Sequence, residues 1–171
     1  MTARSRQESV VADLIVILTE QALGVGDAKR ITDLHGGEEL RYHVLVPADT
    51  ERNLLVDVID HLSMLELRKA LDAVRRREPS ADQARTSASD ALASSLEALR
   101  GNGIEADGEV TQDDPLPAVQ QAIDTHHARE VVVVTRPHAM EDTFHRDWAS
   151  RARDELGVPV LHVYAGTTFL G

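Results

Sequence analysis

Side chains that could bind a small or anionic ligand follow three short apolar stretches of the sequence. Such stretches are typical of strands buried on both faces of a parallel sheet, and the carboxyl ends of parallel strands meet at one edge. Arg136 and His138 could make charge-assisted hydrogen bonds to an anion there. The alternative is a surface loop in which Arg136 pairs with Glu141 or Asp142. The candidate ligand-binding residues are Thr19, Glu20, Pro47, Ala48, Thr135, Arg136 and His138.

Two groups of side chains are of types that bind metal ions. Neither has the spacing of a known site, because Pro137 makes it doubtful that His138 and His145 share one continuous helix. The dipole of a helix favours histidines at its carboxyl end, and His126 and His127 fit that role. We therefore predict no metal site. The first group consists of His138, Glu141, Asp142 and His145.

The sequence shows no constellation typical of an enzyme. No serine lies in a Gly-x-Ser-x-Gly nucleophile elbow, and the absence of cysteine excludes thiol nucleophiles, disulfides and cysteine-ligated zinc. The carboxylates near the first two strands do not pair into an evident acid–base dyad. We therefore expect a protein without catalytic residues. These carboxylates are Asp13, Glu20, Asp49 and Asp57.

Composition limits the partners and the location of the protein. The 171 residues suit one domain, and a formal net charge of -11 repels the phosphates of nucleic acids and anionic membranes. The apolar run Val10–Leu18 is interrupted by Asp13 and is too short to span a bilayer. It also lacks two features of a signal peptide, a basic region that leads into an uninterrupted apolar stretch and a small-residue cleavage pattern. We therefore expect a cytoplasmic protein that binds neither nucleic acid nor membrane.

Strand and helix patterns alternate along most of the chain. Asp27 is predicted to cap a first helix that carries Ala28, Ile31 and Leu34 and ends at Gly36–Gly37. An order of strands separated by long helical connections requires a parallel sheet with helices on both faces. The alternating stretch near residue 105 suits an edge strand. Strands are predicted at Leu14–Leu18, His43–Val46, Ile104–Val110, Val131–Val134 and Pro159–Tyr164.

Four further helices follow from apolar periodicity and from the residues at their ends. They are expected at Leu54–Val74, at Ala81–Arg100 with Gly101 as C-cap, after Asp113–Asp114 with Pro115 as the first helical residue, and through Trp148, Ala152 and Leu156 up to Gly157. Residues 1–9 are expected to form a disordered tail. The rest, residues 10–171, is expected to form one domain with a helical insertion at about 54–78.

The pattern from residue 81 onward resembles the universal stress protein superfamily. With the first two strands added, the likeness covers nearly the whole chain, and it is strongest to divergent actinobacterial members. The resemblance implies a three-layer α/β sandwich with a five-stranded parallel sheet in the strand order 3-2-1-4-5, like that of the adenine nucleotide alpha hydrolases. The residues that carry it are Gly103–Val110, Asp114–Leu116, Val131–Val134 and Gly157–Val163.

The sequence departs from the ATP-binding members of that superfamily at two places. Those members have an aspartate at the end of the first strand, where this chain has Thr19–Glu20. They also have a Gly-x-x-Gly motif after the fourth strand, where this chain has Thr135–His138. Glycines let backbone N–H groups approach phosphate oxygens, and Pro137 removes one such donor. The ATP-binding members also have a Gly-Ser/Thr pair nine residues after the Gly-x-x-Gly motif. Near the corresponding place this chain has Trp148, whose ring would crowd a phosphate. ATP is therefore not expected as a cofactor.

These observations favour a non-enzymatic module in stress response that acts through protein contacts, as a homodimer or with another protein. The last strand supports this hypothesis, because an edge strand followed by apolar residues tends to be paired or covered. The alternative is a small-molecule or nucleotide binder, or a slow nucleotide hydrolase, that uses the cleft at the strand ends. A third hypothesis is a subunit of a larger complex that exposes Leu62, Leu65 and Leu67.

Overall fold

The computed structural model describes residues 12–36, 38–48, 81–112, 115–135 and 152–166. These residues form a five-stranded sheet in the order β3-β2-β1-β4-β5, and every neighbouring pair of strands is parallel. The predicted sheet, its strand order and its parallel direction are therefore confirmed. The strands are β1 (Asp13–Thr19), β2 (Leu40–Pro47), β3 (Glu105–Thr111), β4 (Glu130–Thr135) and β5 (Val160–Tyr164).

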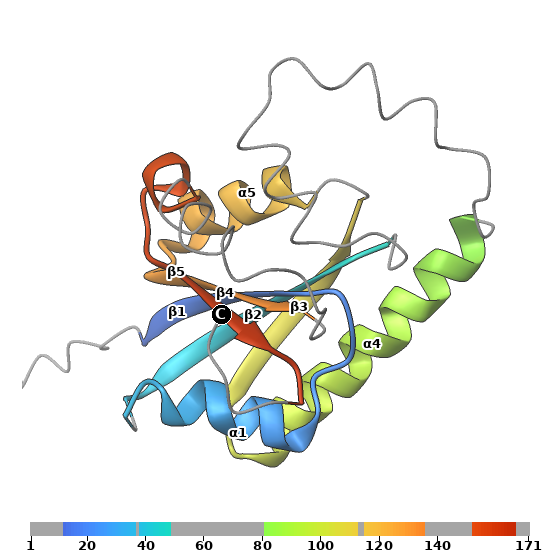
Figure 1. Ribbon diagram of the computed structural model, residues 1–171, viewed down its shortest axis with the longest axis horizontal. Coiled ribbons are helices and arrows are strands. Elements are labelled where there is room, and N and C mark those ends of the chain that lie inside the picture. The colour runs from blue at the N-terminus through green and yellow to red at the C-terminus, as the bar shows by residue number, and fades with distance from the viewer. Residues whose placement is uncertain (1–11, 37, 49–80, 113–114, 136–151, 167–171) are drawn as a thin grey trace, which may run out of the picture.

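Helices cover both faces of the sheet (Figure 1). Helices α1 (Val25–Asp33) and α4 (Ala81–Gly101) lie on one face, and α5 (Leu116–His126) and the short helix of residues 152–156 lie on the other. Each face has its own apolar cluster, so the side chains of β1 alternate between the two: Ile15 and Ile17 pack toward α1, and Val16 and Leu18 pack toward α5. This double burial explains why the central strands are continuous apolar runs.

The first helix begins earlier than its sequence predicts. Its N-cap is Gly24 rather than Asp27, and Asp27 is the third helical residue. The Asp27 carboxylate still binds the start of the helix, because the Gly24 N–H donates to it over 3.2 Å. The same carboxylate accepts the Gly166 N–H at 2.7 Å, beyond the end of β5. From the third helical position, the Asp27 carboxylate can accept both N–H groups, one before the helix and one beyond β5.

Two other helix ends also differ from the sequence prediction by one or two residues. Gly101 is the last residue of α4, and Gly103 has the positive φ, +77°, that usually follows a helix end. Pro115 is the N-cap of α5, so Leu116 is the first helical residue and Pro117 takes the early helical place expected for a proline. The C-cap is His127, with φ 53°, so the prediction that His126 and His127 end a helix is confirmed.

Several predicted features lie outside the described residues. They are the tail of residues 1–9, the helix Leu54–Val74, the caps Asp113–Asp114 and the start of the last helix at Trp148. Within the described ranges, no helix has both the length and the apolar character needed to cross a membrane.

Candidate functional site

Five of the seven candidate ligand-binding residues lie within the described part of the chain, at one edge of the sheet. Thr19, Pro47 and Thr135 are the last residues of β1, β2 and β4, and Glu20 and Ala48 follow the first two of these. The strands are parallel, so these ends lie at the carboxyl edge. Arg136 and His138 lie outside the described residues. That the seven residues together bind a ligand stays a prediction.

The end of β1 is fixed by hydrogen bonds within the chain. Thr19 is fully buried, and its hydroxyl donates to the Gln21 carbonyl at 2.7 Å, which closes a turn. Further on, the Leu23 N–H donates to the Ser95 hydroxyl of α4 at 2.9 Å, and that hydroxyl donates to the Ala91 carbonyl. The segment after β1 is therefore tied to α4, which leaves the Thr19 hydroxyl turned into the chain rather than toward solvent.

Thr135 has a partner that the sequence did not indicate. Its Oγ1 lies 2.8 Å from Nε2 of His162 on β5, and both residues are at most 3% exposed. The Tyr164 ring stands edge-on to the His162 ring, with 4.6 Å between centroids. A hydroxyl and an imidazole at this distance form a hydrogen bond. Because both side chains are buried, the main role of this bond is to join β4 to β5. A histidine inside an apolar strand is the one sequence signal that could have indicated it.

We expect the substitution Thr135→Val to destabilise the protein by about 1–2 kcal/mol, because valine keeps the shape of threonine but cannot bond to the buried His162 Nε2. Urea denaturation measures the free energy of unfolding. Thr135→Ser is the control, since it keeps the hydroxyl. Equal stability of Thr135→Val and the unchanged protein would show that this hydrogen bond contributes nothing.

A groove of about 520 Å³ opens at the same edge, at the end of β3. Its strand side is lined by Glu109, Val110, Thr111 and Gln112, and its helix side by Pro117, Ala118 and Gln121 of α5. Pro47 pairs with Thr111 across the sheet, and the Ala48 N–H donates to the Thr111 carbonyl at 3.0 Å. Two predicted candidates thus adjoin the groove, although its lining residues were not predicted.

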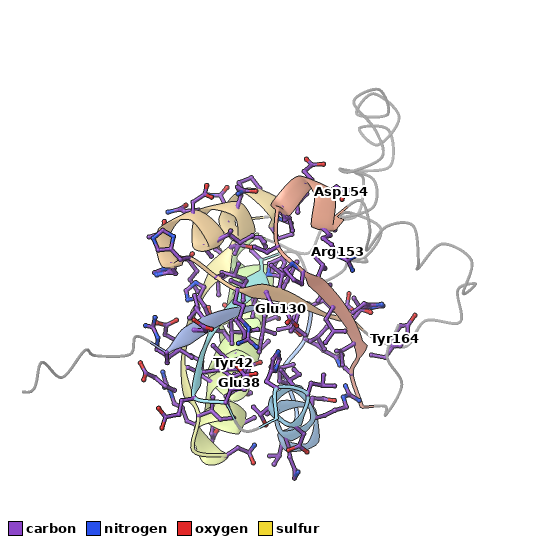
Figure 2. The ribbon with its side chains drawn as sticks, turned by 90° about the vertical axis from the view of Figure 1, so that its left-hand side faces the viewer. Glu38, Tyr42, Glu130, Arg153, Asp154 and Tyr164 are labelled. Carbon is purple, nitrogen blue, oxygen red and sulfur yellow. The ribbon has the colours of Figure 1, made fainter. Side chains whose placement is uncertain are left out.

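A second polar group lies at the opposite, amino edge of the sheet. His35 Nδ1 lies 2.8 Å from the Ile31 carbonyl and 3.3 Å from the Tyr42 hydroxyl, and His35 Nε2 lies 3.5 Å from Glu130. In Figure 2, Tyr42 of this group lies well apart from Tyr164 at the end of β5. Burial, and then the charge of Glu130, raises the pKa of Tyr42 to about 12. These contacts therefore hold the end of α1 against β2 and β4, and the group is not part of the candidate site.

The high pKa of Tyr42 predicts a loss of stability at alkaline pH. A phenol with an ordinary pKa of 10.0 that rises to about 12 on folding stabilises the protein fully below pH 10. That contribution is lost as the pH rises from about 10 to about 12. Urea midpoints of the unchanged protein should therefore fall more steeply over this range than those of Tyr42→Phe. Parallel curves would contradict the prediction.

An exposed ion pair lies close to that group. Arg129 donates to Glu38 and, over 3.3 Å, to Asp13. The hydrogen bond from Arg129 lowers the pKa of Glu38, and the bond to Glu38 raises the pKa of Arg129. All three side chains are more than a third exposed, so water and salt screen the attraction and it adds little stability.

The described residues contain no group of three or more histidines, aspartates and glutamates that could hold a metal ion. His126 lies with its ring 5.4 Å from that of His43, and His43 Nδ1 pairs with Asp107 at 2.5 Å. The other predicted group, His138, Glu141, Asp142 and His145, lies outside the described residues. The prediction that the chain lacks a metal site therefore stays a prediction.

The strand order of the parallel sheet and the helices on both of its faces define a three-layer α/β sandwich. The chain is similar to the structure of a universal stress protein from Archaeoglobus fulgidus, with a TM-score of 0.50 and 10% sequence identity, over 88% of this chain and 93% of that one. It is also similar to a universal stress protein family protein from Arabidopsis thaliana with AMP bound, with a TM-score of 0.48, 9% identity and coverage of 90% and 93%.

No protein-family model and no curated protein matches the sequence. At identities near a tenth, the likeness to solved structures concerns the fold. The resemblance inferred from the sequence is confirmed at that level, because a shared fold does not by itself imply a shared function.

Proposed function

We propose that this protein is a non-enzymatic contact module that pairs with a second copy of itself through β5 and does not hold ATP in the usual way. The observation that carries the proposal is the difference between the two outer strands of the sheet. Strand β3 carries three exposed carboxylates, Glu105, Asp107 and Glu109. Strand β5, Val160–Tyr164, has no aspartate, glutamate, lysine or arginine, and its one basic side chain, His162, is buried. Charges along an outer strand oppose pairing with another sheet, so β5 is the strand suited to it.

Contacts at its carboxyl end hold β5 in a fixed position. The Arg30 guanidinium of α1 donates to the Tyr164 carbonyl at 2.7 Å, and the Ala165 N–H donates to the Thr135 carbonyl at 2.8 Å. A strand held in this way loses little conformational freedom on binding. Pairing of β5 with its copy about a two-fold axis would place the same half-buried side chain, Leu161, in both halves of the contact.

The substitution Leu161→Lys is expected to convert the dimer to a monomer. The change places one charge from each copy in the contact, where like charges repel and lose their water. Size-exclusion chromatography with light scattering at micromolar concentration measures the mass of both proteins. The unchanged protein should have twice the mass of one chain, and the variant the mass of one chain.

Leu34→Lys serves as the control, because it adds the same charge at an exposed leucine that ends α1. This variant should remain dimeric. Circular dichroism and thermal unfolding show whether each variant is folded. If the protein without a substitution is monomeric throughout the micromolar range, the proposed dimer is contradicted.

A small-molecule or nucleotide binder is the second candidate function. Thr19, Pro47 and Thr135 end neighbouring strands at one edge, and the groove beside Ala48 opens at that edge. Pro137 and the absence of glycine between Thr135 and Gly157 support the view that ATP is not held there in the usual way. Calorimetric titration with ATP, ADP, AMP and cyclic nucleotides separates the two functions: no heat of binding supports the contact module, and saturable binding that Arg136→Ala removes supports the binder.

A further inference from the structure

The groove at the end of β3 has apolar walls and a carboxylate at its rim. Pro117 and Ala118 supply apolar surface, and Glu109 supplies an exposed carboxylate. The other polar side chains of the lining are amides and one hydroxyl, and none is basic. Such a lining does not favour an anion. It suits a lysine or arginine side chain, whose aliphatic stem prefers apolar contact and whose charged end prefers a carboxylate.

The negative charge continues from the groove along the strand. Glu105, Asp107 and Glu109 alternate with residues that face α4, so the three carboxylates lie on one side of β3, and all three are exposed. In the sheet formed by the described residues, β3 is the last strand on its side, with β2 as its strand neighbour. The spacing of the carboxylates equals the spacing of alternate side chains in an extended segment that lies beside the strand.

The chain itself already places one guanidinium against this strand. Arg100, from the end of α4, donates from Nε and from one terminal nitrogen to the Ala106 carbonyl, over 3.1 and 2.7 Å. A backbone carbonyl of β3 therefore accepts an arginine in the folded protein. The arginine lies near the beginning of the strand, and the groove lies at its other end.

We propose that the groove receives a lysine or arginine side chain from an extended, basic segment of a partner protein that lies along β3. The proposal rests on the contact function proposed above and names the chemistry of a second partner. It uses the edge of the sheet opposite to β5, so a dimer formed through β5 leaves the groove accessible. Charge complementarity selects the partner, because the groove and the strand beside it present carboxylates to an extended chain.

A capped seven-residue peptide in which lysine alternates with threonine and valine is the probe. Backbone amide shifts of the full-length protein, followed by NMR during titration at low salt, report binding. We expect saturable shifts at residues 105–112 and 117–121. The substitution Glu109→Gln should weaken binding about two- to fivefold, the range of one exposed charge pair. Glu97→Gln, at an exposed position of α4, should leave the affinity unchanged.

Three results would overturn the proposal: no shift at millimolar peptide, shifts confined to other elements, or equal binding of the same peptide with glutamate in place of lysine. Spermidine, a free polyamine, is a further arm. If spermidine shifts the same amides with the same affinity, the groove binds cations generally and the peptide partner is wrong. The dimer test is independent, because Leu161→Lys changes the mass of the protein whether or not the peptide binds.

Discussion

Replacement of Gly108 by alanine is expected to destabilise the protein by about 3 kcal/mol, at the upper end of the cost of overpacking. Gly108 lies in the middle of β3, opposite Val44 of β2. A Cβ at this position would lie 2.2 Å from the Val44 carbonyl oxygen and 2.9 Å from a methyl carbon of Leu92. The methyl carbon can move, but the carbonyl belongs to the neighbouring strand. The two strands would therefore have to separate locally, which weakens the ladder and the contact of α4 with β3.

Urea denaturation followed by circular dichroism measures the change, and Gly26→Ala is the matched control. Gly26 lies in the first turn of α1, where a Cβ would meet no atom within 4 Å. Alanine there should leave the protein as stable or stabilise it by about 0.5–1 kcal/mol, because it lowers the entropy of the unfolded chain. If both variants lost the same stability, close approach of β2 and β3 would not be the reason.

The sequence predicted the sheet well because the signals for buried parallel strands are local. Val131–Val134 is four valines in a row, and Pro47 and Gly157 mark a strand end and a helix end without reference to the rest of the chain. The right-handed crossover between parallel strands and the long helical connections then restrict the possible strand order. The start of α1 was placed three residues late because Asp27 has the chemistry of a cap, and nothing nearby indicates that its carboxylate also binds Gly166, 139 residues away.

The candidate site was predicted in part for the same reason. Thr19, Pro47 and Thr135 could be placed at strand ends from the local pattern alone. The bond between Thr135 and His162 could not, because it depends on the register of β4 against β5, in which Val133 faces His162 and Thr135 faces Tyr164. The groove depends on how the start of α5 packs beside the end of β3. No local sequence pattern predicts the distance between these two elements.

Loss of the Asp27 carboxylate is expected to destabilise the protein by about 2–3 kcal/mol and to loosen the chain beyond β5. Asp27 is 8% exposed, and its carboxylate accepts the Gly24 and Gly166 N–H groups and pairs with Arg30 over 3.4 Å. Asp27→Ala leaves two N–H groups without this acceptor and a largely buried guanidinium without its carboxylate. Amide hydrogen exchange by NMR should show faster exchange at Gly166, and urea denaturation the loss of stability.

Asp33→Ala on the same helix is the matched control, because Asp33 is exposed and pairs with Lys29 at the surface. It should cost at most about 0.5 kcal/mol and leave exchange at Gly166 unchanged. Asp27→Asn separates charge from hydrogen bonding, since its amide oxygen can still accept an N–H. If Gly166 exchanged at the same rate in all three variants, the carboxylate would not hold the end of β5. If it exchanged faster in Asp27→Ala alone, hydrogen bonding rather than charge would fix the strand that we propose as the dimer contact.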